Sequence, residues 1–282
     1  MTKIAWVTDS TAFFDDYLLN HPDVYSIPIT ILLDEKEFTD GVDLSPNELY
    51  DRLKVLKNPP KTSQPSIGAF RNLYESLQDK YDLIIAVLVS SKLSGTVSSS
   101  EQAAQMVNIR VITIDSKILT YPLTRLVKKG IEWADSGLNP DEVKDELDQL
   151  RDTNETYVLI GSLEQLHRSG RLTGLQFFLG SMMSVKPIIS IVDGALLIKE
   201  KTRSERKAKD KIVKLLKETH ESKPVKEVYI LFGLHDEEAL KWKEELTEDF
   251  PEITFSIYPL GAAIGVHAGE NTLGISWFKG LE

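Results

Sequence analysis

The sequence predicts an α/β protein made of two α/β domains, residues 1–155 and 156–282. In the first half, short apolar runs alternate with segments whose apolar residues recur at helical spacing, a pattern typical of parallel strands joined by helices. After residue 155 the strand-like runs lie further apart, and two of them flank Asp193-Gly194, a dipeptide that favours a tight hairpin turn. We therefore expect a mostly parallel sheet flanked by helices in the N-terminal domain, and a mixed sheet with helices in the C-terminal domain.

The elements of the first domain follow from apolar runs and helix-start signals. Ser45 is placed to cap a helix whose first position is Pro46, a residue that favours the first turn. The run LIIAVLV at residues 83–89 is too short to span a bilayer and suits a buried strand. The expected order is strand 3–8, strand 25–33, helix 46–56, helix 67–81, strand 82–91, a helix in the second part of 92–107, strand 109–115 and helix 123–137.

The second domain has more strand-like runs and two long helical segments. Residues 163–174 are expected to form an exposed turn, and the nearly all-apolar residues 175–191 favour core packing, although Met and Phe also line adaptable cavities. This apolar stretch contains Phe177, Phe178, Met182 and Met183. We expect strands at 156–161, 227–233 and 254–260, a hairpin over 186–203, and helices at 204–220 and 236–250.

Composition and charge limit the classes of function. The chain has 33 Lys and Arg against 43 Asp and Glu, a formal net charge of −10. This balance argues against a general nucleic-acid binder and disfavours adhesion to anionic membranes, because both need clustered positive charge. The absence of Cys excludes disulfides, thiolate nucleophiles and Cys-bound metals. The first residues, MTKIAWVTDST, lack the pattern of a signal peptide, so we expect a soluble cytoplasmic protein.

Three polar loops are expected at the carboxyl ends of the first domain's strands, where open α/β sheets bind their ligands. They are TDST at residues 8–11, KTSQPS at 61–66 and SSKLSGT at 90–96. A Ser or Thr in any one of these loops could simply cap a helix. Together, their hydroxyls and the free amides at a helix start form a neutral site that suits an anion.

Other chemistries fit the sequence less well. There is no G-x-S-x-G elbow, no G-x-x-x-x-G-K-[ST] loop, and no G-x-G-x-x-G after the first strand. TDST resembles the start of an aspartyl phosphatase loop, but Thr11 stands where a second acid would be needed after Asp9. No two His residues have metal-ligand spacing, so we expect no metal, no cofactor and no catalytic residue. His267 stays a candidate because it lies in the Gly-rich segment 265–275, where backbone can approach a ligand closely.

Six motifs occur in the order found in the DegV family, which comprises the fatty-acid-binding subunits of bacterial fatty acid kinase. They are VTDST, KTSQPS, SSKLSGT, HRSGRL, KPIISIVDG and HAGENTLGI, and the resemblance covers essentially the whole chain. It implies a two-domain α/β protein that buries one long-chain fatty acid in an apolar tunnel between the domains. A separate ATP-binding kinase subunit would phosphorylate the carboxylate to an acyl phosphate for phospholipid synthesis. The binding subunit itself would have no nucleotide site and would not be an enzyme on its own.

The resemblance also implies roles for individual residues. Thr62 and Ser94 match the family's carboxylate ligands, with the backbone amides of Gly95 and Thr96 close by. His267 matches a histidine near the head group. On this reading Thr62 is a head-group ligand, whereas Ser66 of the same motif is a helix cap.

Two basic positions and two departures from the family complete the comparison. Arg171 and Arg203 match positions that dock the kinase subunit, and the family's function allows transient membrane contact. In the last motif Glu270 and Asn271 replace Pro and Gly, which adds a negative charge near the expected carboxylate. Residues 117–123, KILTYPL, lack the family's small residues, so the tunnel lining is expected to differ.

Two other functions remain open from the residues alone. One is a hydrolase or phosphotransferase acting by itself, for which His267 with Ser94 is the only candidate pair of base and nucleophile. The other is a lipid sensor that acts through ligand-dependent protein contacts.

Overall fold

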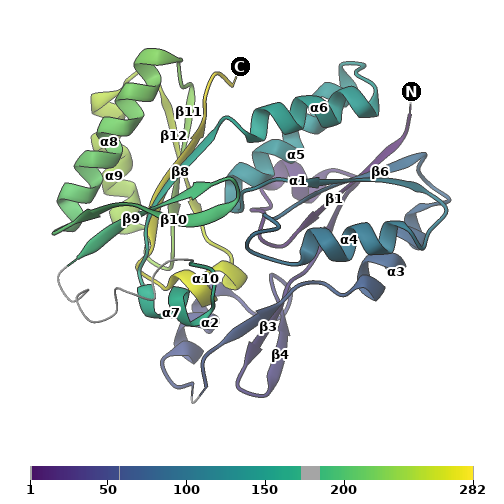
Figure 1. Ribbon diagram of the computed structural model, residues 1–282, viewed down its shortest axis with the longest axis horizontal. Coiled ribbons are helices and arrows are strands. Elements are labelled where there is room, and N and C mark those ends of the chain that lie inside the picture. Colours follow the sequence, from purple (N-terminus) through teal and green to yellow (C-terminus); the bar gives the residue numbers. More distant parts are fainter. Residues whose placement is uncertain (1, 57, 173–184, 282) are drawn as a thin grey trace. The chain divides into compact units, whose positions relative to one another are not determined.

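The computed structural model describes residues 2–56, 58–172 and 185–281 (Figure 1). It divides into two compact units, Met1–Asp152 with Gly261–Ala263, and Thr153–Leu260 with Ile264–Glu282. The sequence-based domains, 1–155 and 156–282, stay a prediction, because a compact unit is not by itself an independently folding domain. Four residues of the apolar stretch lie outside the described residues: Phe177, Phe178, Met182 and Met183.

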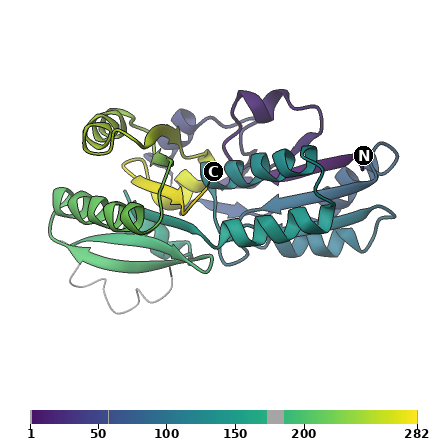
Figure 2. The same ribbon diagram turned by 90° about the horizontal axis from the view of Figure 1, so that it is seen from above.

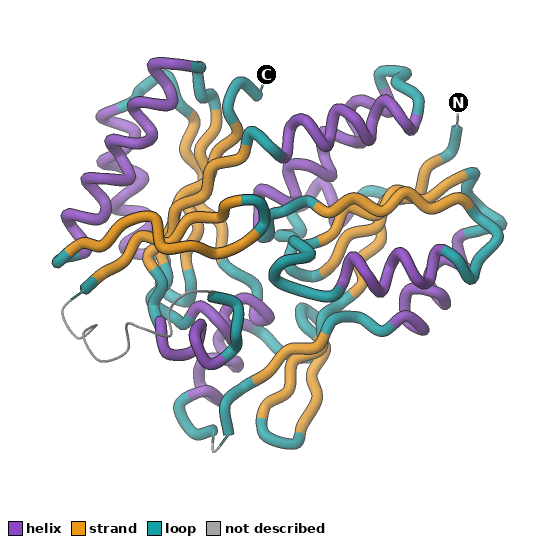
Figure 3. The backbone as a smooth tube through the Cα atoms, viewed as in Figure 1, coloured by secondary structure: helices purple, strands orange, loops and turns teal. Residues whose placement is uncertain are grey.

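The first unit contains the parallel sheet that the sequence predicts (Figure 3). Every residue of its inner strand β6 is buried, as expected for a parallel strand covered on both faces. The strand order is β2-β1-β6-β7, with all neighbours parallel. The bounds are β1 (Ile4–Asp9), β2 (Val24–Ile27), β6 (Leu83–Leu88) and β7 (Arg110–Asp115).

Helices cover both faces of this sheet. On one face, Phe70 and Tyr74 of α3 and Val97 of α4 join a buried cluster with Ala5 and Val7 of β1. Side chains alternate along a strand, so Trp6 points to the other face, where it lies against α5. The helices of this unit are α1 (Asp16–Asn20), α2 (Pro46–Leu53), α3 (Ile67–Leu77), α4 (Thr96–Ala104), α5 (Thr120–Asp135) and α6 (Pro140–Arg151). Ser45 caps α2 as predicted, whereas α6 was not expected from the sequence.

A small antiparallel sheet, β4-β3-β5, also belongs to the first unit and corrects two expectations. The single strand predicted over residues 25–33 is two strands, β2 and β3, because Pro28 between them has no N–H to donate to a ladder. The first half of KTSQPS is a strand rather than a turn. The bounds are β3 (Thr30–Leu33), β4 (Lys36–Thr39) and β5 (Lys61–Ser63).

The second unit is built on a mixed sheet of order β10-β9-β8-β13-β11-β12, which confirms the predicted class. The β9–β10 hairpin turns at Asp193 (φ 47°) and Gly194 (φ 82°), the two left-handed positions that a type I′ turn requires. The strands are β8 (Asn154–Leu159), β9 (Lys186–Val192), β10 (Ala195–Thr202), β11 (Glu227–Phe232), β12 (Thr254–Pro259) and β13 (Leu273–Phe278).

Two long helices pack on one face of the mixed sheet, and Figure 2 shows α8 beside the green hairpin. Ile212 of α8 and Trp242 of α9 are buried against Ile230 and Trp277 of the sheet. The helices are α7 (Leu163–Arg168), α8 (Glu205–Ser222), α9 (Glu237–Asp249) and α10 (Ala262–Ala268), of which α10 begins in the first unit. Helix α7 occupies part of the predicted exposed turn, and neither α10 nor strand β13 was expected.

Candidate functional site

The loops after β1, β6 and β7 are joined at the carboxyl edge of the parallel sheet. The amide of Val89 donates to Asp9 Oδ2 at 2.7 Å, and the amide of Ser90 donates to the carbonyl of Ile118 at 3.0 Å. The amide of Thr120 donates to the carbonyl of Thr11 at 3.0 Å. The structure therefore brings TDST and SSKLSGT to one edge of the first unit.

Asp9 organises this edge. Its side chain is fully buried, and it accepts bonds from the Thr11 amide (3.0 Å), the Thr11 hydroxyl (2.6 Å) and the Val89 amide. Burial raises the pKa of Asp9, and these hydrogen bonds oppose that rise. Both carboxylate oxygens of Asp9 accept hydrogen bonds from Thr11 or Val89. Asp9 therefore holds the two loops together, whereas the nucleophile of a phosphatase needs a carboxylate oxygen that can reach the substrate.

Ser94, Gly95 and Thr96 form the start of helix α4. The Ser94 amide donates to the Ser90 carbonyl at 3.0 Å, and the hydroxyls of Ser94 and Thr96 are 2.8 Å apart. Gly95 is the N-cap, and no side chain in the described part of the protein caps this helix. The first turn of α4 therefore offers backbone amides beside two hydroxyls, which is an arrangement suited to an anion.

The KTSQPS segment lies against that helix start. Thr62 is half-buried in β5, where it pairs with Ile31. Ser66 accepts from the Ala69 amide at 3.1 Å and caps α3, as the sequence predicts. Between them, the side chain of Gln64 lies over Gly95, and a Cβ placed on Gly95 would be 2.8 Å from Gln64 Nε2. Gln64 was not among the predicted site residues, although it stands inside the motif that drew attention.

His267 belongs to the second unit and lies in the last turn of α10, so the first part of the Gly-rich segment 265–275 is helical. It is half-buried, and burial, followed by the positive charge of Arg171, lowers its pKa to about 4. His267 is therefore a neutral imidazole at pH 7. Arg171 follows α7, donates Nη1 to the Ser169 carbonyl at 2.6 Å, and has its own pKa lowered by burial.

The predicted site residues thus fall into two groups. Thr62 and Ser94–Thr96 lie in the first unit, in two segments that meet where Gln64 contacts Gly95, and His267 lies near Arg171 in the second. Arg203 is exposed, directly after the end of β10. The roles of all seven residues remain predictions.

Glu270 and Asn271, the departures from the family motif, have a firmly held backbone. The Leu234 amide donates to the Glu270 carbonyl at 2.8 Å, and a Cβ on Gly161 would be 2.8 Å from the Asn271 backbone. The left-handed conformation falls on Gly269 (φ 85°), and Asn271 does not adopt it. The two replacements therefore change side chains on a loop whose backbone packs closely against Gly161 and Gly233.

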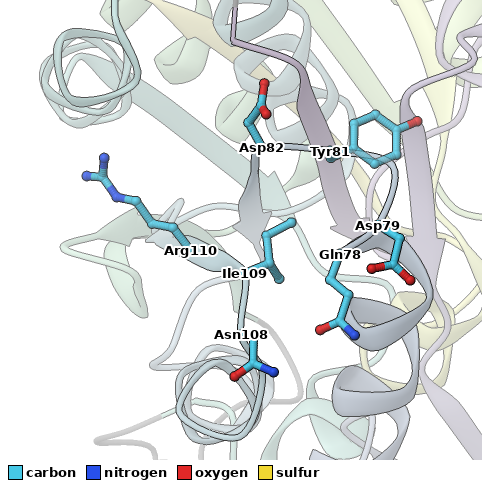
Figure 4. Close-up of a pocket in the computed structure, with 7 residues that line it drawn as sticks. All are labelled: Gln78, Asp79, Tyr81, Asp82, Asn108, Ile109 and Arg110. Carbon is cyan, nitrogen blue, oxygen red and sulfur yellow. The ribbon is translucent and has the colours of Figure 1, made fainter.

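A polar pocket lies at the opposite end of the parallel sheet (Figure 4). Its volume is about 270 Å³, and it is lined by residues at the amino ends of β6 and β7. These are Gln78, Asp79, Tyr81, Asp82, Asn108, Ile109 and Arg110. Since ligands of open α/β sheets bind at the carboxyl ends of strands, this pocket is separate from the candidate loops.

Neither a metal-binding cluster nor a membrane-spanning helix is found among the described residues. No group of three or more His, Cys, Asp or Glu residues there could hold a metal ion. None of the helices described is long and apolar enough to cross a membrane.

Comparison with known proteins shows the family. Residues 3–280 match the family model described as "Uncharacterised protein, DegV family". Protein DegV of Bacillus subtilis is 34% identical over 277 residues, covering 98% of this chain and 99% of the relative. A DegV domain-containing protein of Listeria monocytogenes is 31% identical over 277 residues, covering 98% of each chain. The chain therefore belongs to the DegV family.

Solved structures agree with this assignment. The crystal structure of DegV from B. subtilis, described as a fatty acid binding protein, matches with a TM-score of 0.89 and 33% identity over 99% of this chain and all of that one. A DegV family protein from Thermus thermophilus, described by its fatty acid binding, matches with a TM-score of 0.90 and 28% identity over 98% and 99% of the two chains. The Streptococcus pneumoniae fatty acid kinase (Fak) B3 protein loaded with linoleic acid shares the fold, with a TM-score of 0.84 and 20% identity over 99% and 100%.

Proposed function

We propose that this protein binds one long-chain fatty acid and presents its carboxylate to an ATP-dependent kinase subunit, which converts it to an acyl phosphate. The observation that carries the proposal is the full-length match to the B. subtilis DegV structure, a fatty acid binding protein with 33% identity and a TM-score of 0.89. The chain would act in the cytoplasm, where the kinase subunit finds ATP.

The affinity for such a ligand comes from its tail. Burial contributes about 0.8 kcal/mol per methylene, so a chain of about sixteen carbons gains roughly 10 kcal/mol before the cost of ordering it. The head group needs only enough hydrogen bonds to replace water.

Neutral donors suit the head group in this proposal. In the first unit, Thr62 and Ser94 would supply hydroxyls, and Gly95 and Thr96 would supply amides at the start of α4, which no described side chain caps. In the second unit, His267 is neutral at pH 7. Bonds from neutral donors hold a carboxylate without the strength of a bidentate Arg pair. Such a site also accepts the acyl phosphate product and lets it leave.

The kinase subunit is proposed to dock at the basic positions Arg171 and Arg203. Arg203 is exposed, which suits a charged contact with a partner. The sequence contains none of the usual phosphate-binding loops, so the nucleotide would come with the partner. Transient membrane contact would serve to load and release the lipid.

Binding and phosphorylation of variants test the proposal. The purified protein is titrated with palmitate, and a fatty acid kinase ATP-binding subunit then supplies phosphorylation. We expect Thr62→Val with Ser94→Ala to weaken palmitate binding by about thirtyfold and to slow acyl-phosphate formation, since each of the two lost bonds contributes about 1 kcal/mol. Ser98→Ala, which removes an exposed hydroxyl from the same helix, is the matched control. Unchanged acyl-phosphate formation in the double variant would refute the head-group assignment, and absence of palmitate binding by the unmodified protein would refute the function.

A further inference from the structure

Gln64 and Gly95 make a contact that links two separate segments of the first unit. Measured from the position where a Cβ on Gly95 would lie, Gln64 Nε2 is at 2.8 Å, Cδ at 3.1 Å and Oε1 at 3.5 Å. The distances to Nε2 and Cδ are shorter than ordinary van der Waals contact, and that to Oε1 lies within it, so the Gln64 carboxamide occupies the space that a side chain at position 95 would need.

The backbone of Gly95 does not itself require glycine. Its φ of −77° and ψ of 9° are accessible to any residue. The three nearest atoms to its missing Cβ, chain neighbours aside, all belong to Gln64. Glycine at position 95 therefore leaves room for the Gln64 carboxamide, and the chain does not need glycine there to turn.

Both ends of this contact are anchored. Gln64 directly follows β5, in which Thr62 pairs with Ile31, and it precedes Pro65, which is buried. On the other side, the amide of Ser94, next to Gly95, donates to the Ser90 carbonyl at 3.0 Å. The Gln64 side chain therefore lies between two backbone segments, each of which is held by its own hydrogen bonds.

We propose that Gln64 is a positioning residue that fixes the separation between Thr62 and the first turn of α4, and so makes the protein select a carboxylate head group. The inference rests on the proposed function, because it concerns the same head-group site. Gln64 is exposed, so it contributes little to folding, and a variant at this position reports mainly on the site.

A double-mutant cycle with two ligands tests the proposal. Gly95→Ala displaces the flexible end of Gln64 without straining the backbone, and Gln64→Ala removes it. Dissociation constants are measured for palmitate and for methyl palmitate, which has the same tail and no charge. We expect each single variant to weaken palmitate binding by about tenfold and to leave methyl palmitate within about twofold. The double variant is expected to bind palmitate no more weakly than Gln64→Ala alone, since both changes remove the same contact.

Two further variants separate positioning from other roles. Gln64→Met keeps the length and the packing on Gly95 and is expected to retain palmitate affinity within about threefold. A loss with Gln64→Met as large as with Gln64→Ala would mean that the amide itself bonds to the ligand, and it would overturn the positioning role. Gln102→Ala, at an exposed Gln on α4, is the control and should change neither ligand's affinity.

The outcomes distinguish this inference from the function beneath it. Additive losses in the double variant, or equal losses for the acid and the ester, would overturn the inference. If Thr62→Val weakens palmitate binding while Gly95→Ala and Gln64→Ala do not, the inference fails and the proposed function stands. If the unmodified protein binds neither ligand, both fail.

Discussion

The carboxylate of Asp40 accepts a hydrogen bond from the backbone amide of Ala263 at 3.1 Å, although 223 positions separate the two residues. Both residues belong to the first unit, and this bond holds Gly261–Ala263 to the rest of that unit. Asp40 also accepts from the Ser10 hydroxyl at 2.7 Å, and its residue is only 3% exposed. Burial, assisted by the charge of Asp9, raises the pKa of Asp40 to about 6 against the bonds that stabilise the carboxylate.

Asp40 makes stability depend on pH in an unusual direction for an acid. Its pKa is higher in the folded protein than the ordinary value of 3.8, so between those values the folded state holds more protons than the unfolded state. The Asp40 contribution is therefore fully present below the ordinary value and is lost as pH rises to about 6. The loss is about 3 kcal/mol, from 1.36 kcal/mol per pKa unit.

Asp40→Asn removes this titration and tests its sign. We expect the free energy of unfolding of the variant, minus that of the unmodified protein, to increase between pH 4 and pH 6 and to level off above that. Urea unfolding at several pH values gives this difference, from which the contributions of groups that do not interact with Asp40 cancel. A difference that falls as pH rises would contradict the burial argument.

Gly130 of α5 lies against the ring of Trp6, which is 3% exposed. A Cβ at Gly130 would be 2.6 Å from Trp6 Cζ3 and 3.1 Å from Leu147 Cδ1. We expect Gly130→Ala to lower the free energy of unfolding by about 1–3 kcal/mol through overpacking, despite the better helix propensity of Ala. Gly68→Ala is the matched control, because the nearest described atom to its Cβ is Ser66 Oγ at 3.8 Å. It should leave stability unchanged or raise it by up to about 1 kcal/mol. Thermal unfolding of the two variants compares them, and equal effects would contradict the close packing on Trp6.

The pKa of His267 reports on its surroundings directly. NMR titration of the imidazole should give a value near 4, because burial disfavours the charged ring and the charge of Arg171 adds to this. Burial is the larger cause, so Arg171→Gln should raise the pKa while leaving it below the ordinary 6.5. His167→Gln, at a second imidazole in α7, is the control that identifies which resonance belongs to His267. A pKa at the ordinary value would show that the ring is solvated.

Patterns that depend on neighbours in the chain gave reliable predictions of the fold. The apolar run of β6, the Ser45 cap with Pro46, and the Asp193-Gly194 turn each carry a local physical cause, and each is confirmed. The predicted parallel and mixed sheets followed from these elements.

Elements whose reason lies in distant residues were missed. Strand β5 is three residues long and exists because β3 pairs with it. Strand β13 includes Gly274, which reads as a loop residue, but a Cβ there would be 2.8 Å from the Tyr157 carbonyl on the neighbouring strand. Gly274 lets β13 approach β8 closely, and the sequence alone does not show that these two strands are neighbours.

The candidate site shows the same division. Ser66 could be assigned as a cap from its position before an amphipathic segment, and the structure confirms it. The contact of Gln64 with Gly95 joins positions 31 residues apart, which no local pattern encodes. Likewise, the effect of Arg171 on His267 depends on two positions far apart in the chain that the second unit brings close together.

The most direct test of the central claim is mass spectrometry of the purified protein, first under native conditions and then after solvent extraction. The account predicts one equivalent of a long-chain fatty acid per chain in the native spectrum, with the same acid recovered in the extract. A protein that is empty as purified and takes up neither added palmitate nor added oleate would contradict it.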